Sequence, residues 1–146
     1  MTGGAPSVDW KSLVAQAQPR RKSVRLCLRG DLLFDLESAR GAGNGERVGE
    51  LEQQVAGSTV EFVLAGLNSQ KYRQLLAAHK TPDDDSRAWN DETFPEDLVR
   101  KCLISPQIGA DEPLFDVLTQ AQIEQLFEAA FLVCNEVDDL PLLKRG

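Results

Sequence analysis

The sequence has one histidine and three cysteines among its 146 residues, and no two cysteines form a Cys-x-x-Cys pair. It therefore lacks the motif of a zinc site or a thioredoxin-like redox centre. A serine or cysteine nucleophile needs a base, and His79 is the only imidazole in the chain. A lone histidine on a helical face beside Tyr72 and Leu75 is typical of a packing residue. We therefore predict a protein that is not an enzyme, with no catalytic residues, no metal and no cofactor.

Long apolar runs and a leader peptide are missing as well. No run approaches the ~20 residues that a membrane helix needs. The first residues, Met-Thr-Gly-Gly-Ala-Pro, lack the charged start and apolar core of a signal peptide. Each cysteine lies in an apolar run, which is typical of reduced, buried thiols; the three are Cys27, Cys102 and Cys134. We expect a soluble protein of a reducing compartment, with no membrane partner.

The charge of the chain is unevenly distributed. Its net charge of −7 makes nucleic acid an unfavourable partner. Residues 1–30 hold six basic groups and one acid, whereas residues 81–116 hold ten acids and three basic groups. Contact between opposite ends of two copies would be favoured by this polarity, so we predict a homo-oligomer.

Two segments have compositions that are found in ligand sites, but their spacing is wrong for one. The glycine-rich loop at 41–45 lacks the Gly-Lys-Ser/Thr of a P-loop and the spacing of a dinucleotide fold. Asp83, Asp84 and Asp85 are consecutive, so their side chains point in different directions, and the alternating spacing of a calcium loop is absent. We interpret them as a solvated acidic loop. A metal-assisted enzyme that uses these aspartates with His79 remains an alternative.

Hydrophobic periodicity predicts an α+β fold, a mostly helical single domain with a small sheet of two to three strands. The predicted segments are an N-terminal tail and short amphipathic helix (1–22), the α+β domain (23–137) and a C-terminal tail (138–146). Within them we expect helices over 10–17, 31–40, 46–56, 69–79, 93–104 and 119–135, and strands over 23–29 and 59–67. The two strands share the pattern Ser/Thr-Val-x-apolar-x-Leu-x-Gly, which suggests that they pair with each other.

Helix starts are marked by polar residues at several places. Asp31 is a candidate cap for the helix that follows it, and Asn68 or Ser69 for another. Capping boxes are predicted at Thr93-x-x-Glu96 and at Thr119-x-x-Gln122, where side chains and backbone amides bond reciprocally.

Two helices carry more apolar surface than a chain of this size needs. The helix at 10–17 is too short to be stable alone, so it must dock on its own domain or on a neighbour. In the last helix all six residues of 129–134 are apolar, so it is buried on two sides or shared with a partner. The candidate partner-binding residues are Trp10, Leu13, Trp89, Phe127, Phe131, Leu132 and Val133. For Phe127 and Phe131, a simple core role is at least as well supported.

Residues 60–135 resemble the core pattern of the tail assembly chaperones of long-tailed, siphovirus-like bacteriophages and prophages. The resemblance begins with a strand ending in Leu64-Ala65-Gly66-Leu67 and a helix with Tyr72-x-x-Leu75-Leu76. It continues with Thr93-Phe94-Pro95-x-x-Leu98-Val99-x-x-Cys102-Leu103-Ile104-x-Pro106 and closes with Leu118-Thr119-x-x-Gln122-Ile123. These are packing and capping residues.

The resemblance implies a function in the infected host cell. Such chaperones bind the tape measure protein, keep it soluble and help to recruit tail tube protein during tail morphogenesis. They act in the host cytoplasm and are absent from the mature virion. This chain would be the short form of a pair that is made by translational frameshifting. The alternatives are a structural tail or head-completion protein that stays in the virion, and a small host adaptor protein.

Overall fold

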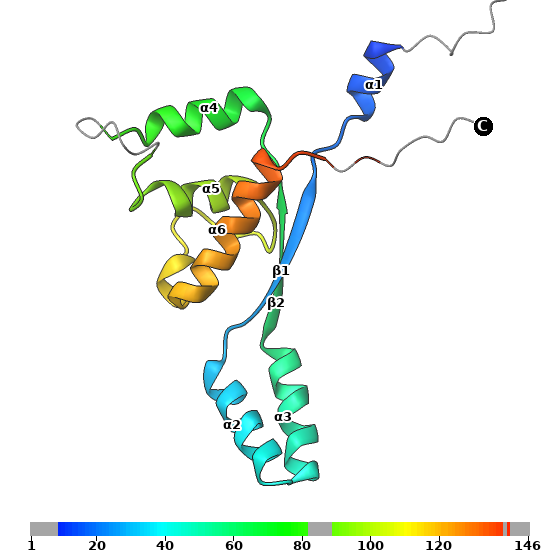
Figure 1. The fold of residues 1–146 in the computed structure, drawn as a ribbon, viewed down its shortest axis with the longest axis vertical. Helices are drawn as coiled ribbons and strands as arrows, with labels where there is room; N and C mark the ends of the chain where they lie inside the picture. Colours follow the sequence, from blue (N-terminus) through cyan, green and yellow to red (C-terminus); the bar gives the residue numbers. More distant parts are fainter. Residues whose placement is uncertain (1–8, 82–88, 139, 141–146) are drawn as a thin grey trace, which may run out of the picture.

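The computed structural model describes residues 9–81, 89–138 and 140 of the chain. The described residues form six α-helices, one short 3-10 helix and a three-stranded antiparallel sheet, which confirms the predicted α+β class. Three parts are distinct in Figure 1: a main body of sheet and helices, a helical hairpin beyond one end of the sheet, and a short helix that stands away from the other end.

The sheet is narrow, with the strand order β1-β2-β3. β1 (Arg21–Cys27) and β2 (Thr59–Ala65) pair antiparallel along their whole length, with Val24 opposite Phe62 and Leu26 opposite Val60. The two strands of shared pattern therefore do pair. β3 (Leu103–Ser105) adds a short edge to β2. Because side chains alternate along a strand, Val24 and Leu26 of β1 share one face with Val60, Phe62 and Leu64 of β2.

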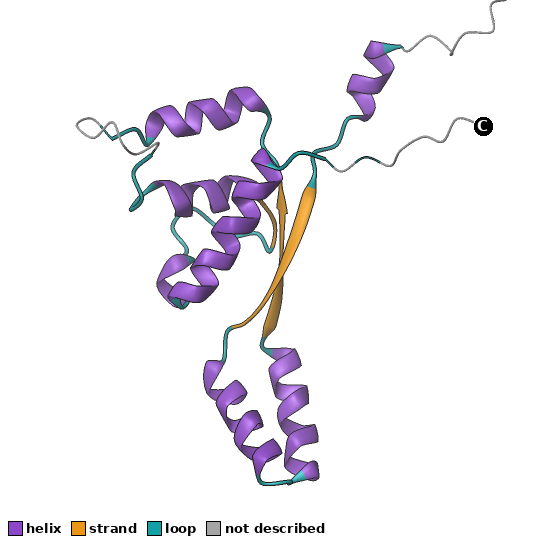
Figure 2. Ribbon diagram, in the orientation of Figure 1, coloured by secondary structure: helices purple, strands orange, loops and turns teal. Residues whose placement is uncertain are grey.

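Three helices cover that face of the sheet (Figure 2). They are α4 (Ser69–Ala78), α5 (Phe94–Cys102) and α6 (Gln120–Asn135), and the short helix η1 (Phe115–Val117) precedes α6. α6 packs on β1, β2 and α5, so it is buried on two sides. The main core consists of buried residues from β1, β2, α4, α5 and α6, together with Leu114 just before η1: Leu26, Phe62, Leu64, Leu75, Phe94, Leu98, Val99, Cys102, Leu114, Leu126, Ala129, Ala130 and Val133.

The connection between β1 and β2 is a helical hairpin with a core of its own. α2 (Gly30–Gly41) and α3 (Gly45–Gly57) pack on each other through Leu32, Leu36, Ala39 and Leu51. The hairpin projects beyond the end of the sheet, away from α4, α5 and α6 (Figure 1). In the tight turn between the helices, Gly43 has φ +71°, which favours glycine.

The predicted helix caps have different outcomes. Asn68 caps α4, since its side chain accepts from the Lys71 amide at 2.8 Å. α2 begins at Gly30, so Asp31 lies in its first turn and forms a bidentate contact with the Arg29 guanidinium. The assignment of Asp31 as the cap was therefore wrong.

Only one of the two predicted capping boxes forms. At α6, the Gln122 amide donates to the Thr119 hydroxyl at 3.2 Å, and the Thr119 amide donates to the Gln122 side chain at 3.1 Å. At α5, the Thr93 side chain makes no capping bond. The Thr93 hydroxyl contacts His79. The Glu96 carboxylate accepts from the Arg100 guanidinium and from the Phe115 amide. Tertiary partners have replaced the local bonds.

Gly66 allows β2 and α6 to approach closely. A Cβ at this position would overlap the backbone carbonyl of Val133. The Gly66 amide also donates to the Arg20 carbonyl at 2.9 Å, which extends the β1–β2 pairing by one bond. The end of β2, the start of β1 and the end of α6 therefore meet at one junction, from which both terminal segments leave.

Candidate functional site

An exposed apolar surface lies on α1 (Trp10–Gln16), which has no buried residue. Trp10 is 74% exposed, Leu13 47% and Val14 52%. These residues follow the i, i+3, i+4 spacing of one helical face, which the sequence predicted. Yet α1 stands away from the main body, as Figure 1 shows. A seven-residue helix gains little stability from its own hydrogen bonds, so contact of its apolar face with another surface would stabilise it.

The base of α1 is held by charged groups at the junction. Arg20 lies 3.5 Å from the Glu136 carboxylate and 3.1 Å from that of Asp138, and the Lys22 ammonium lies 2.8 Å from Glu136. The hydrogen bond from Lys22, helped by the charge of Arg20, lowers the pKa of Glu136. Solvent still reaches about a third of the Arg20, Lys22 and Glu136 side chains and more of Asp138, so each pair contributes little stability by itself. They position the segment that leads to α1.

A hollow of about 670 Å³ separates α1 from the body. Its lining comes from α1 and the segment after it (Val14, Ala17, Gln18, Pro19, Arg20) and from the body (Gly66, Leu67, Asn68, Lys71, Val133). The lining is mainly apolar, with Arg20 and Lys71 as its charged members. An apolar segment that entered this space would contact α1 and the body together.

The aromatic candidates from the sequence lie together in one cluster. Trp89 packs on Phe94 with ring centroids 4.9 Å apart, and on Phe131 at 5.8 Å. Phe127 contacts Phe94 at 6.1 Å and Phe131 at 6.0 Å. Trp89, Phe127 and Phe131 are half-buried against the main core. Such aromatic pairs add to stability beyond their buried area. Phe127 and Phe131 therefore have a core role, which the sequence analysis gave as the alternative to partner binding.

The remaining candidates on α6 are also covered. Val133 is only 7% exposed and belongs to the main core. Leu132 is half-buried and lines a shallow hollow with residues of β1. The apolar excess of residues 129–134 is therefore accounted for by packing on the sheet and on α5. Of the seven candidate residues, Trp10 and Leu13 are exposed, and the other five are half-buried or buried.

A second exposed apolar site, which was not predicted from the sequence, lies on α2. Phe34 is 69% exposed, and Leu33 beside it is 44% exposed. The signal was present in the run Leu32-Leu33-Phe34, because one face of a helix cannot bury three consecutive residues. Leu32 faces α3, which leaves its two neighbours uncovered.

A hydroxyl, an imidazole and a carboxylate meet between α4 and α5. His79 Nδ1 lies 2.7 Å from the Thr93 hydroxyl, and Nε2 lies 2.7 Å from an Asp97 carboxylate oxygen. The order of groups resembles a catalytic triad. However, the three groups hold structural positions. Thr93 is the N-cap of α5, and Pro95 removes one amide donor from that helix end. The His79 ring packs edge-on against Phe94. The cluster fastens the end of α4 to the start of α5.

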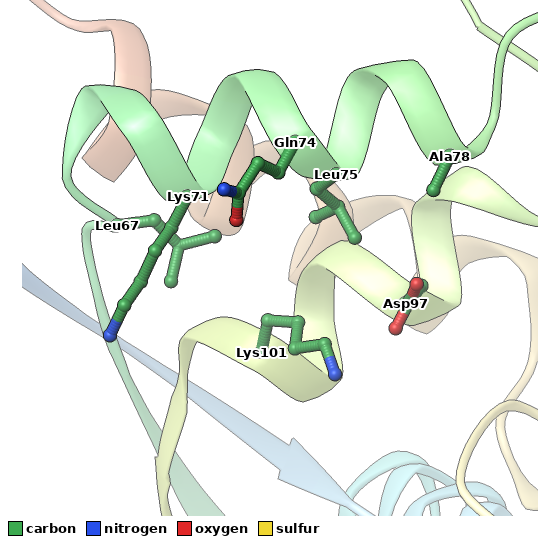
Figure 3. A pocket seen from close by; sticks show the side chains of 7 residues that line it. All are labelled: Leu67, Lys71, Gln74, Leu75, Ala78, Asp97 and Lys101. Atoms are coloured by element: carbon green, nitrogen blue, oxygen red, sulfur yellow. The ribbon is translucent and has the colours of Figure 1, made fainter.

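A hollow of about 500 Å³ lies beside this cluster, in the angle between α4 and α5 (Figure 3). It is lined by Leu67, Lys71, Gln74, Leu75, Ala78, Asp97 and Lys101, and neither Thr93 nor His79 reaches its wall. The floor is apolar, and the ammonium groups of Lys71 and Lys101 extend along its edge. The Asp97 carboxylate also lines the hollow, so its charged members are of both signs.

In the part of the chain that the structure describes, no group of three histidine, cysteine, aspartate or glutamate residues is placed to hold a metal ion. Asp83–Asp85, the acidic loop of the sequence analysis, lies outside the described residues. None of the described helices is long and apolar enough to cross a membrane.

Comparison with known proteins finds no match: no family model, no curated protein and no solved structure is similar to this chain.

Proposed function

We propose that this protein is a non-enzymatic tail assembly chaperone, the short form, which binds the tape measure protein, keeps it soluble and helps to recruit tail tube subunits. The motif resemblance over residues 60–135 suggests the family. The observation that carries the binding role is α1, with its uncovered apolar face and Trp10 at 74% exposure. In this proposal, the apolar stripe of a client helix covers that face, as in helix-in-groove recognition.

The size of α1 limits the strength of one contact. Full burial of one apolar side chain is worth about 1.5–3 kcal/mol. Because Trp10, Leu13 and Val14 are already partly covered, burying all three is worth roughly 5 kcal/mol. Ordering the two partners opposes a substantial part of that gain. One copy therefore binds weakly. Many copies along a long tape measure helix hold it by avidity, and each can leave when tail tube subunits replace it.

The charge of the chain supports the same role. A net charge of −7 on each bound copy keeps an apolar client and its coat apart from other complexes. Lys11 lies on α1 and Arg21 at the start of β1 near its base, so acidic positions beside the apolar stripe of a client would be favoured.

Co-expression with the tape measure protein of the same genome tests this proposal. Trp10→Asp with Leu13→Asp should leave the chaperone folded, because neither residue is packed, but should send the tape measure protein to the insoluble fraction. Phe34→Asp is the matched control, since Phe34 is nearly as exposed as Trp10 but lies on α2. Equal solubility of the client with wild-type and α1 variants would refute the role of α1.

Mass analysis of purified particles tests the chaperone class itself. A chaperone leaves before the tail is finished, so no peptide of this chain should be found. A fixed number of copies per particle would instead identify a structural protein of the tail or head.

A further inference from the structure

Two cysteines that are far apart in the sequence lie side by side in the fold. Cys102 is the last residue of α5, and Cys134 lies one residue before the end of α6. Their sulfur atoms are 3.7 Å apart. A disulfide requires about 2.05 Å, so a small rotation of the two side chains would bring them to bonding distance. The sequence predicted three reduced, buried thiols; Cys102 is buried, whereas Cys27 and Cys134 are half-buried, and no Cys-x-x-Cys pair indicated this contact.

The two thiols differ in environment. The hydrogen bond from the Cys102 thiol lowers the pKa of Cys134, and the Leu67 amide, which donates to the Cys134 sulfur at 3.4 Å, acts in the same direction. The same contact with Cys134, together with burial, raises the pKa of Cys102. Cys134 is half-buried, whereas Cys102 is buried. The thiolate is the reactive form of cysteine, so Cys134 is the group that meets a reagent first.

We infer that Cys102 and Cys134 form a reversible disulfide site that is oxidised by small disulfides of the glutathione type. First, the Cys134 thiolate attacks one sulfur of the small disulfide, forms a mixed disulfide and releases one thiolate. Next, the Cys102 sulfur attacks the Cys134 sulfur and releases the second small thiolate, which takes up the proton of Cys102. The protein loses two thiol hydrogens, and one small disulfide becomes two thiols.

The bond would join two helix ends at the junction beneath α1. Cys134 is two residues before Glu136, which contacts Arg20 and Lys22 at the base of α1. A bond from α5 to α6 would therefore fix the end of α6 against the body and close a loop from residue 102 to 134. A loop of that length restricts the unfolded chain, so the oxidised protein should unfold at a temperature roughly 10 °C higher. This inference does not depend on the chaperone proposal.

Oxidation of the purified full chain with oxidised glutathione at about pH 8 tests the site. After alkylation of the remaining thiols, mass spectrometry should show the loss of two hydrogens and a peptide pair that links Cys102 to Cys134. The Cys27→Ser variant should behave in the same way, because Cys27 is at the end of β1 far from the junction, where its thiol contacts the Arg29 carbonyl. Reduction by dithiothreitol should restore the original mass and unfolding temperature.

Single variants separate the two steps. Cys102→Ala should stop at the mixed disulfide on Cys134, and Cys134→Ala should react at least tenfold more slowly at the remaining Cys102. The inference would be overturned if the wild-type chain stopped at the mixed disulfide, if Cys27 formed the principal bond, or if Cys134→Ala reacted as fast as wild type.

Discussion

α1 and α6 are both amphipathic helices with an excess of apolar residues, but their surroundings are opposite. α6 lies on β1 and β2 with α5 beside it, so its over-apolar half is covered on two sides. α1 has the same kind of apolar face and no buried residue. An excess of apolar residues therefore does not by itself identify a binding helix. The 16-residue α6 supplies part of the core, whereas the seven-residue α1 lies outside the core and leaves its apolar face exposed.

The largest expected effect comes from removing buried volume on α6. Leu126 is fully buried, so Leu126→Ala should lower the free energy of unfolding by about 2–5 kcal/mol. Trp10→Ala, on α1, should change it by less than about 0.5 kcal/mol, because the side chain is exposed and makes no core contact. Urea denaturation measures both values. Similar losses for the two variants would show that α1 is packed in solution and would remove the contrast between the helices.

A second comparison uses two glycines. Gly66→Ala places a methyl group on the Val133 carbonyl, a backbone atom that cannot move aside easily, so the variant should lose about 1–3 kcal/mol of stability. Gly49, inside α3, has open space around its Cβ position, so Gly49→Ala should gain about 0.5–1 kcal/mol. Thermal unfolding of both variants measures the difference. A neutral Gly66→Ala would show that β2 and α6 do not meet at the junction.

The smallest effect is the pH dependence of the junction. The pKa of Glu136 is lowered in the folded state, so its pairs with Lys22 and Arg20 are complete above the pKa of an unfolded glutamate. As the pH falls through the lower, folded pKa, Glu136 is protonated and this contribution disappears. An NMR titration of Glu136 should give a pKa below the ~4.3 of a free glutamate side chain. A normal value would mean that the base of α1 is not held there.

Most of the fold could be predicted because its signals are local. Strand alternation in β1 and β2, the period of α6, the cap at Thr119 and the helical hairpin with Leu51 inward all follow from neighbouring residues. β3 was not predicted as a strand, because three residues carry no periodicity. The capping box at Thr93 failed for a different reason, since His79 and Arg100, from other turns, hold its side chains instead.

The candidate site could be predicted only in part. Periodicity identifies an apolar face but not what covers it, so Trp10 and Val133 were indistinguishable in sequence although one is exposed and the other buried. The Cys102–Cys134 contact depends on how α5 and α6 pack, over a separation of 32 residues. Phe34 was not predicted to be exposed, because the helical period of α2 locates only its inward residues, Leu32 and Leu36.

The most direct test of the central claim measures the environment of Trp10 while the client binds. Trp89→Phe leaves Trp10 as the single tryptophan and keeps an aromatic ring in the cluster with Phe94. The emission of this variant should be that of an exposed indole in the free protein. It should shift to shorter wavelength when a tape measure helix is added, with a midpoint that agrees with binding measured by calorimetry. Binding without any change in the Trp10 emission would contradict the account, because the client would then lie elsewhere than on α1.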